Sequence, residues 1–180
     1  MEISLYSNTC LINADCNKYM QYMPDQSIDL IITSSPYADQ REKTYGGISP
    51  DKYVEWFIPI TKEFKRILKP SGTFILNIKE KAINGERHTY VLELILNMRM
   101  NGWLWTEEFI WHKKKVYPDN VLYLATECSN RNHSASFPET LPEWLIKLFT
   151  DPGDWVVDPF LGSGTICAVA RKLKRNSVGY

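Results

Sequence analysis

The sequence lacks several features that would assign it to a functional class at once. No apolar run approaches the roughly 18 residues needed to span a bilayer, and the first residues lack the basic and apolar regions of a secretory signal. Lys and Arg total 21, and Asp and Glu also total 21, so no bulk positive charge indicates a nucleic-acid binder. We therefore expect a cytoplasmic protein with no membrane partner. The neutral balance excludes only binding by bulk charge.

Cysteine and histidine are also scarce. The four cysteines form no Cys-x-x-Cys pair and no metal-ligand spacing with the three histidines. The pattern therefore predicts neither a disulfide framework nor a metal site. Reduced and mostly buried thiols are the expected state.

The length and composition are typical of one globular domain. The chain has 180 residues, of which 44% are hydrophobic and 23% charged, with no repeat, linker or low-complexity tract. Residues 1–180 are therefore expected to form a single domain around one core. Short β-rich runs alternate with helical stretches, which indicates an α/β fold with a mainly parallel sheet.

Apolar periodicity predicts the individual elements. The segment 28–32 is nearly continuously apolar, as in a strand covered on both faces. From residue 51, apolar residues recur at helical spacing until Lys-Pro-Ser-Gly at 69–72 ends the helix. The other expected strands are 73–78, 107–112, 121–124, 154–158 and 176–180, and the other expected helices are 90–100, 141–149 and 165–174.

A glycine-bearing turn follows the strand at 154–158. Asp158 ends the strand, Gly162 and Gly164 lie in the turn, and a helix begins at Thr165. This order is typical of a nucleotide-type ligand site at the carboxyl end of a parallel strand, where a carboxylate can bind a polar or cationic group. A purely structural turn is the alternative. No Lys follows the second glycine, so the pattern is not a triphosphate-binding loop.

A second polar cluster, Thr-Ser-Ser-Pro-Tyr at 33–37, follows the strand at 28–32. A rigid proline between small hydroxyl residues and an aromatic ring would form a slot with acceptors on one side and a stacking surface on the other. Flat polar rings fit such a slot. A simple strand-ending turn is again the alternative.

Together the two clusters resemble the DNA amino-methyltransferases, which transfer the methyl group of S-adenosylmethionine to cytosine N4 or adenine N6. The cofactor signature Asp-Pro-Phe-x-Gly-Ser-Gly-Thr is matched at 158–165. The catalytic signature Ser/Asn/Asp-Pro-Pro-Tyr/Phe is matched at 34–37, except that Ser35 replaces the first proline. Segments 13–16, 68–72 and 133–139 also resemble family features. Because the catalytic motif precedes the cofactor motif, the order resembles the permuted, beta-type group.

The resemblance implies a fold. It is a Rossmann-like methyltransferase fold with a mostly parallel, seven-stranded sheet, helices on both faces and a permuted strand order. The chain would begin at family strand three and end with strands one and two. An acidic residue for the ribose hydroxyls is then expected at a position after Tyr180.

The resemblance also implies site residues. The expected cofactor-binding residues are Asp15, Phe137, Pro138, Asp158, Pro159, Phe160, Gly162, Ser163, Gly164 and Thr165. The expected catalytic residues are Ser34, Ser35, Pro36 and Tyr37. An exocyclic amine is a poor nucleophile, so acceptors at Ser34 and at the Ser35 carbonyl would take its hydrogens while Tyr37 stacks on the extruded base. Methylation at ring carbon C5 is set aside, because no cysteine follows a proline.

The implied substrate is double-stranded DNA with a flipped base. Cytosine N4 is favoured over adenine N6 because Ser34 stands where adenine enzymes more often carry Asp. A degenerate, non-catalytic binding module and a methyltransferase for RNA or protein amines are the alternatives. Family analogy suggests a homodimer and a cognate restriction endonuclease. The family's target-recognition insert is apparently missing near 113–120, so we expect a catalytic core with little sequence specificity.

Overall fold

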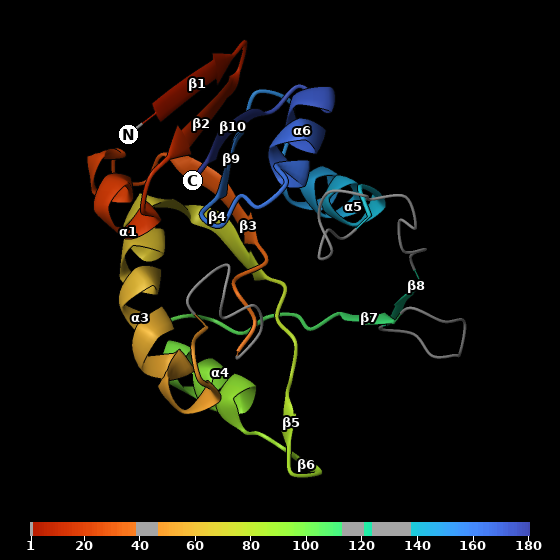
Figure 1. The fold of residues 1–180 in the computed structure, drawn as a ribbon. Helices are drawn as coiled ribbons and strands as arrows, with labels where there is room; N and C mark the ends of the chain where they lie inside the picture. The colour runs from red at the N-terminus through yellow and green to blue at the C-terminus, as the bar shows by residue number, and fades with distance from the viewer. Residues whose placement is uncertain (1, 39–46, 113–120, 124–137) are drawn as a thin grey trace.

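The fold is built on a six-stranded sheet with helices on both faces (Figure 1). The computed structural model describes residues 2–38, 47–112, 121–123 and 138–180. The spatial order of the strands is β1-β2-β10-β9-β3-β4. In this order they are β1 (Glu2–Tyr6), β2 (Thr9–Asn13), β10 (Asn176–Gly179), β9 (Trp155–Asp158), β3 (Ile28–Thr33) and β4 (Leu68–Leu76). β1 pairs antiparallel with β2, and the other four pairings are parallel.

The chain leaves the neighbouring strands β9 and β3 in opposite directions. From β9 it passes through α6 (Thr165–Lys172) to β10, and from β3 it passes through α3 (Pro50–Ile67) to β4. β10 and β4 lie on opposite sides of the β9–β3 pair. In open α/β sheets, ligands bind beyond the carboxyl ends of the strands at such a divergence point. The topology therefore places a candidate site at the ends of β9 and β3.

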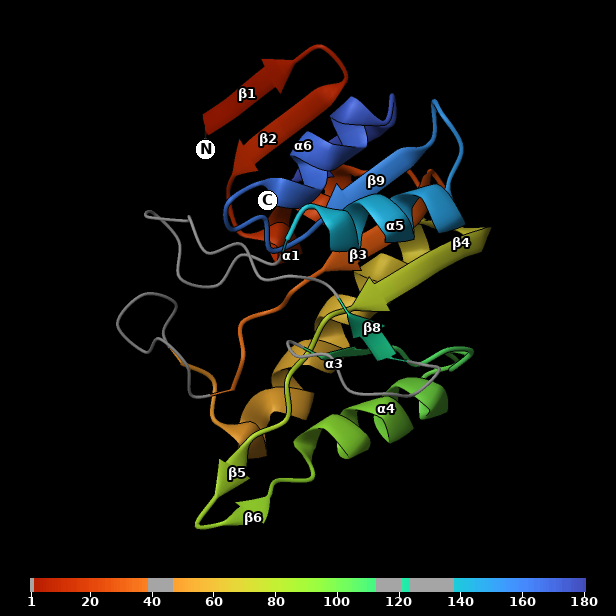
Figure 2. The ribbon, with the colours of Figure 1, turned by 90° about the vertical axis from the view of Figure 1, so that its right-hand side faces the viewer.

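Each face of the sheet has its own apolar core. On one side α3 packs on the sheet and α4 (Tyr90–Met100) packs on α3, while α5 (Thr140–Phe149) and α6 cover the other side (Figure 2). The pleat of β3 divides its side chains between them, with Ile31 in the α3 core and Leu30 and Ile32 in the other. None of the described helices is both long and apolar enough to cross a membrane.

The sequence of α3 explains its position. Pro50 opens the helix, Asp51 lies in its first turn, and Lys65 and Arg66 lie in its last, which suits the helix dipole. Its fully buried apolar side chains recur every three or four residues and so form one stripe. They are Tyr53, Phe57, Ile60, Phe64 and Ile67. Burying this stripe fixes α3 across the sheet between the carboxyl end of β3 and the start of β4.

Several expected elements are corrected by the structure. The main sheet has six strands among the described residues, not seven. The strands expected at 107–112 and 121–124 are present as β7 (Ile110–His112) and β8 (Val121–Tyr123), which pair with each other in a separate parallel sheet. The expected helix 165–174 ends at Lys172. The strand expected at 73–78 is β4, which runs from Leu68 to Leu76 and so includes the Lys-Pro-Ser-Gly stretch expected as a turn. The strands β3, β9 and β10 and the helices α3, α4 and α5 agree with their expected bounds to within one residue.

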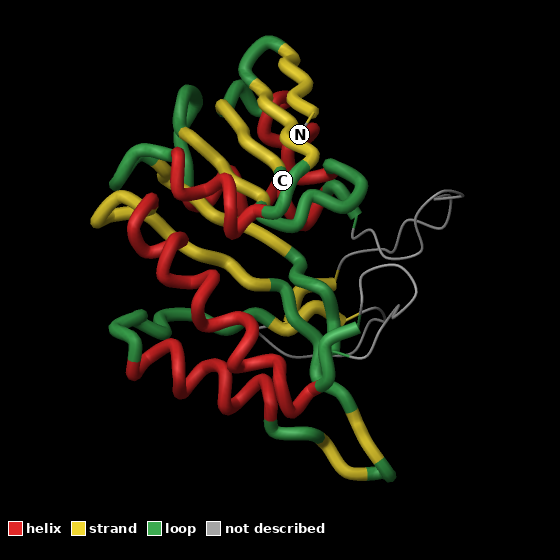
Figure 3. Tube along the Cα trace, turned by 60° about the vertical axis from the view of Figure 1, so that its left-hand side comes forward, coloured by secondary structure: helices red, strands yellow, loops and turns green. Residues whose placement is uncertain are grey.

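The structure contains two hairpins and a short helical segment that the sequence pattern does not predict. β1 and β2 form an edge hairpin, and Ile3 and Leu5 on β1 are 49% and 76% exposed, so their alternation faces no core. This hairpin and β10 bring the two chain ends close together (Figure 3). α1 (Cys16–Tyr19) and the 3-10 helix η1 (Met20–Tyr22) follow it. β5 (Ala82–Ile83) and β6 (Glu86–Arg87) form the other hairpin, whose Asn-Gly tip is a recognised turn signal.

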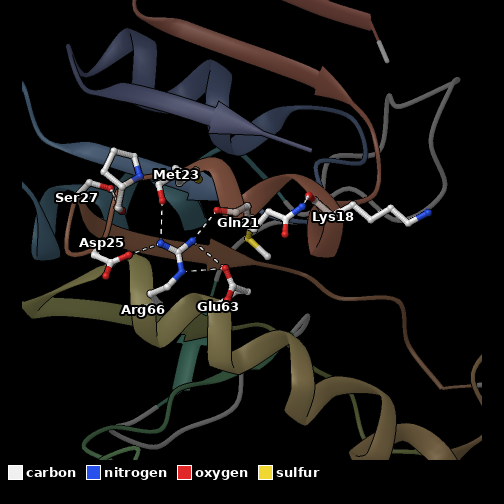
Figure 4. Close-up of polar contacts among 9 residues, drawn as sticks. Lys18, Gln21, Met23, Asp25, Ser27, Glu63 and Arg66 are labelled. Atoms are coloured by element: carbon white, nitrogen blue, oxygen red, sulfur yellow. Dashed lines mark hydrogen bonds and ion pairs between the residues drawn. The ribbon is translucent and has the colours of Figure 1, made fainter.

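Arg66 joins the end of α3 to the segment that leads into β3 (Figure 4). Its Nη2 donates to the Met20 carbonyl and to Glu63 Oε2, both at 2.8 Å. Its Nη1 donates to the Met23 carbonyl at 2.8 Å and to the Asp25 carboxylate. One guanidinium therefore satisfies two backbone carbonyls and two carboxylates, a geometry that the forked Arg side chain can supply and a lysine ammonium cannot.

We expect Arg66→Lys to lower the free energy of unfolding by about 1–3 kcal/mol, because charge is retained while several charge-assisted hydrogen bonds are lost. Urea denaturation followed by circular dichroism would measure this change. Arg171→Lys is the matched control, because Arg171 is exposed at the end of α6. Equal stability of the two variants would contradict a stabilising role for the Arg66 contacts.

Candidate active site

Two side chains meet at the divergence point of the sheet. Thr33 ends β3 and Asp158 ends β9, and the Thr33 hydroxyl donates a 2.8 Å hydrogen bond to Asp158 Oδ1. The backbone N–H of Phe160 donates to the same oxygen at 3.2 Å. Thr33 leads into the cluster 34–37 and Asp158 into the glycine turn. The hydrogen bond therefore joins the two predicted clusters directly.

Asp158 is a buried carboxyl group. It is 2% exposed, and burial raises its pKa from 3.8 to about 7, although the hydrogen bonds from Thr33 and Phe160 lower it. Within the described part of the chain, no cationic side chain pairs with it. A positively charged ligand group would favour its ionised form. The site therefore fits a cationic ligand better than an anionic one.

The glycine turn is tied to the end of β10. Gly162 and Gly164 have φ angles of 53° and 78°, a region that glycine adopts without strain. The Leu161 N–H donates to the Tyr180 carbonyl at 2.8 Å. The Leu161 side chain lies over Gly179, where a Cβ would collide with it. Gly164 caps α6, so the unpaired N–H groups at the helix start lie beside the turn.

The cluster 34–37 is held from the neighbouring strand by Asn77. Asn77 follows β4, and its N–H donates to the Thr33 carbonyl at 2.9 Å, which extends the parallel ladder by one step. Its side-chain Nδ2 donates to Ser34 Oγ at 3.3 Å and to the Tyr37 hydroxyl at 3.2 Å. Ser34 and Tyr37, both half-buried, are themselves 3.4 Å apart at their hydroxyl oxygens. One amide therefore bridges the two residues predicted to contact a base.

Ser35 and Pro36 contact α3 through Tyr53. The Ser35 hydroxyl oxygen lies 2.6 Å from the Tyr53 hydroxyl oxygen, and both side chains are buried. The Tyr53 hydroxyl also donates to the Pro36 carbonyl at 3.1 Å. The cluster 34–37 is thus anchored on one side by β4 and on the other by α3.

The structure brings most of the predicted residues to one edge of the sheet. The residues directly after the ends of β3 and β9 are Ser34, Ser35, Pro36, Tyr37, Pro159, Phe160, Gly162, Ser163, Gly164 and Thr165. Phe160 is held by α3, with its ring centroid 5.7 Å from that of Trp56 and 6.5 Å from that of Phe57. The hydroxyls of Ser163 and Thr165 are 2.8 Å apart.

Asp15 lies at the carboxyl end of β2, on the same edge of the sheet. It is exposed, caps α1 and accepts a 2.9 Å hydrogen bond from the Asn17 N–H. Burial raises the pKa of the adjacent Cys16 thiol to about 12, with further contributions from the charges of Asp15 and Asp158. Cys16 therefore lies within electrostatic range of both carboxylates.

Of the two remaining residues predicted to bind the cofactor, the structure describes one. Pro138 is buried just before α5, whereas Phe137 lies outside the described residues. No group of three metal-ligating side chains occurs among the residues that are described. Tyr53 and Asn77 have no role in the sequence prediction, and Thr33 has none beyond membership of its cluster. Asn77 could have been identified in the sequence as a polar residue directly after the neighbouring parallel strand. No local pattern in the sequence indicates a role for Tyr53.

The sequence matches one protein-family model over most of its length. The model is the N6/N4 DNA methylase family, and it matches residues 28–127 and 120–180. The type II methyltransferase M.PvuII of Proteus hauseri is 24% identical over 268 aligned positions, which cover 97% of this chain and 80% of that protein. YubD of Escherichia coli K12 is 27% identical over 191 residues, which cover 93% of this chain and 82% of YubD.

Solved structures agree with this match. The PvuII DNA methyltransferase, described as cytosine-N4-specific, superposes with a TM-score of 0.84 at 26% identity and covers 96% of this chain and 81% of its own. TTHA0409 of Thermus thermophilus, in complex with S-adenosyl-L-methionine, superposes with a TM-score of 0.70 at 22% identity, covering 94% of this chain and 87% of its own. The chain therefore belongs to the N6/N4 DNA methylase family of S-adenosylmethionine-dependent methyltransferases.

Proposed function

We propose that this chain transfers a methyl group from S-adenosylmethionine to an exocyclic amine of a DNA base, with cytosine N4 as the preferred target. The observation that carries the proposal is the hydrogen bond between Thr33 and Asp158. It joins the glycine turn to the cluster 34–37 at one edge of the sheet, which supports a shared site for donor and acceptor. A methyl donor and an amine acceptor must meet within bonding reach for direct transfer.

The glycine turn supports cofactor binding. Asp158 would hold a positively charged part of S-adenosylmethionine, the open backbone at Gly162 and Gly164 would allow close approach, and Phe160 would supply an apolar contact. Asp15 would contact the adenosine end from the end of β2. When bound, the cofactor supplies an electrophilic methyl group on a sulfonium. The chain itself has to position the acceptor and exclude water.

The catalytic cluster would orient the amine. Ser34 Oγ receives one hydrogen bond from Asn77, and a hydroxyl oxygen has a second lone pair that can accept an amino hydrogen. The Ser35 carbonyl would accept the other amino hydrogen. Tyr37 would stack on the extruded base, with its hydroxyl held by Asn77. Drawing both hydrogens to one side directs the nitrogen lone pair toward the methyl group.

The preference for cytosine rests on two observations. Ser34 is neutral where adenine enzymes of the family more often carry Asp, and the PvuII enzyme that superposes with a TM-score of 0.84 is described as cytosine-N4-specific. Adenine N6 is the second candidate, because the matching family includes both specificities.

We also propose that the chain is a catalytic core with little sequence specificity of its own. The alignment with M.PvuII spans 268 positions, more than the 180 residues here, so that relative carries segments without a counterpart. YubD aligns over only 191 residues, so far fewer positions in that alignment lack a counterpart in this chain. The expected place of the missing insert, 113–120, lies outside the described residues. A homodimer and a partner endonuclease stay predictions from family analogy.

We expect labelled S-adenosylmethionine to transfer its methyl group to DNA rather than to RNA or protein offered side by side. Digestion to nucleosides should yield N4-methylcytosine. Finding only N6-methyladenine would overturn the cytosine preference, and finding 5-methylcytosine would overturn the mechanism. No transfer at all would favour a non-catalytic binding module.

Tyr37→Ala should weaken base binding by about 1–3 kcal/mol through loss of stacking, and Tyr37→Phe should retain most of that binding.

We expect Asp158 to make folding stability depend on pH. Its folded pKa, about 7, lies above its ordinary value of 3.8, so the folded state binds more protons between these limits. The contribution of Asp158 to the free energy of unfolding is therefore fully present below about pH 4 and is lost as the pH rises toward about 7. Relative to Asp158→Asn, the wild type should therefore become less stable between pH 5 and pH 7.5 in urea titrations.

Thr33→Val provides the matched comparison for this pH dependence. It removes the hydrogen bond that lowers the Asp158 pKa, so the loss of stability should extend to higher pH than in the wild type. If the free energy of unfolding of the wild type and of Asp158→Asn changed with pH in the same way, the prediction would be wrong. The carboxyl group would then titrate alike in the folded and unfolded states.

A further inference from the structure

Ser35 occupies the position of the first proline in the family motif, and its side chain is not free. It is 2% exposed, and its hydroxyl oxygen lies 2.6 Å from the hydroxyl oxygen of Tyr53. Such a short distance between buried oxygens is that of a well-formed hydrogen bond. The residue that breaks the motif therefore makes a contact that a proline could not make.

The direction of the hydrogen bonds follows from the number of protons. Tyr53 has one hydroxyl proton, and this proton is donated to the Pro36 carbonyl at 3.1 Å. The Ser35 hydroxyl must then donate to the Tyr53 oxygen. Burial raises the Tyr53 pKa above its ordinary value, so the phenol keeps its proton. The result is a continuous chain from Ser35 through Tyr53 to Pro36 that spans the middle of the catalytic cluster.

Tyr53 is well placed to act as a rigid anchor. It lies in the first turns of α3 and has no exposed surface. Its ring centroid is 4.9 Å from that of Tyr90, 5.4 Å from that of Trp56 and 6.0 Å from that of Phe57. Packing on several sides fixes the ring, and the ring in turn fixes its hydroxyl. The cluster 34–37 is anchored to a helix whose position is set by the core.

A proline at position 35 would restrict the same backbone by a different means. Its ring would fix φ near −65°, whereas the serine side chain has no ring to fix that angle. The following Pro36 already restricts Ser35 to extended conformations. Ser35 is not among the residues with positive φ, so its backbone angle has the sign that a proline needs.

We propose that Tyr53 is a positioning residue for methyl transfer, and that its hydrogen bond with Ser35 replaces the conformational restriction of the absent proline. The proposal rests on the proposed function for the roles of Ser34 and Tyr37, which flank the anchored residues. Without the anchor, Ser34 and Tyr37 would sample more orientations, and fewer would align the amine with the methyl group.

Tyr53→Phe tests the anchor, because it removes both hydrogen bonds and keeps the ring. We expect amide hydrogen exchange at Ser34, Ser35, Tyr37 and Ala38 to become about tenfold faster, with a similar fall in kcat for DNA methylation. The KM for S-adenosylmethionine should change less than twofold, because the glycine turn is not touched. Ser35→Ala, which leaves the aromatic cluster intact, should speed exchange in the same segment if Tyr53→Phe folds poorly.

Rescue by proline is the decisive comparison. In the double variant Tyr53→Phe with Ser35→Pro, exchange at the remaining amides of the segment and kcat should both return to within about threefold of the wild type. Tyr90→Phe is the matched control, because its hydroxyl donates to the Lys79 carbonyl rather than to the cluster. It should leave exchange at 34–38 unchanged.

Each outcome separates this proposal from the proposed function. Unchanged exchange in both Tyr53→Phe and Ser35→Ala, or a double variant as impaired as Tyr53→Phe alone, would overturn the positioning role. If the wild type methylates no nucleic acid, the proposed function fails, whereas faster exchange in Tyr53→Phe with proline rescue would still support the anchor.

Discussion

The hydrogen bond from Thr33 to Asp158 is the contact on which the site depends. It joins the ends of the neighbouring strands β3 and β9, where the chain departs in opposite directions. Burying a carboxyl group there is costly, and two donors on one oxygen offset only part of that cost, which is why the pKa rises to about 7. The site is therefore poised for a ligand that brings positive charge. A cofactor with a sulfonium group meets that requirement.

Helix α3 connects the parts of this site to the core. Near its start Tyr53 contacts the cluster 34–37, and one turn later Trp56 and Phe57 pack on Phe160 of the glycine turn. In its last turn Arg66 fixes the segment that leads into β3. The same apolar stripe that buries the helix thus orients both halves of the site. A change in α3 packing would therefore move the glycine turn and the cluster 34–37 together.

Much of the fold and site could be predicted because the signals are local. A strand, a carboxylate, a glycine turn and a helix start follow one another within about ten residues at Asp158, and the cluster at 34–37 follows its strand in the same way. The edge hairpin of β1 and β2 could not be predicted so easily, because Ile3 and Leu5 are exposed and their alternation faces no core. The two strands expected at 107–112 and 121–124 required long-range pairing to join the main sheet, and as β7 and β8 they instead pair with each other.

The sequence by itself determined the element types, the parallel α/β class and the two motifs, since each depends on residues close together in the chain. Only the tertiary structure decided which distant side chains support those motifs. Asn77 reaches Ser34 and Tyr37 across 40 or more residues, and Thr33 reaches Asp158 across 125. Tyr53 reaches Ser35 from another element as well. No local pattern indicates that these residues pair with each other, because strand order and helix packing bring them together only after the chain has folded.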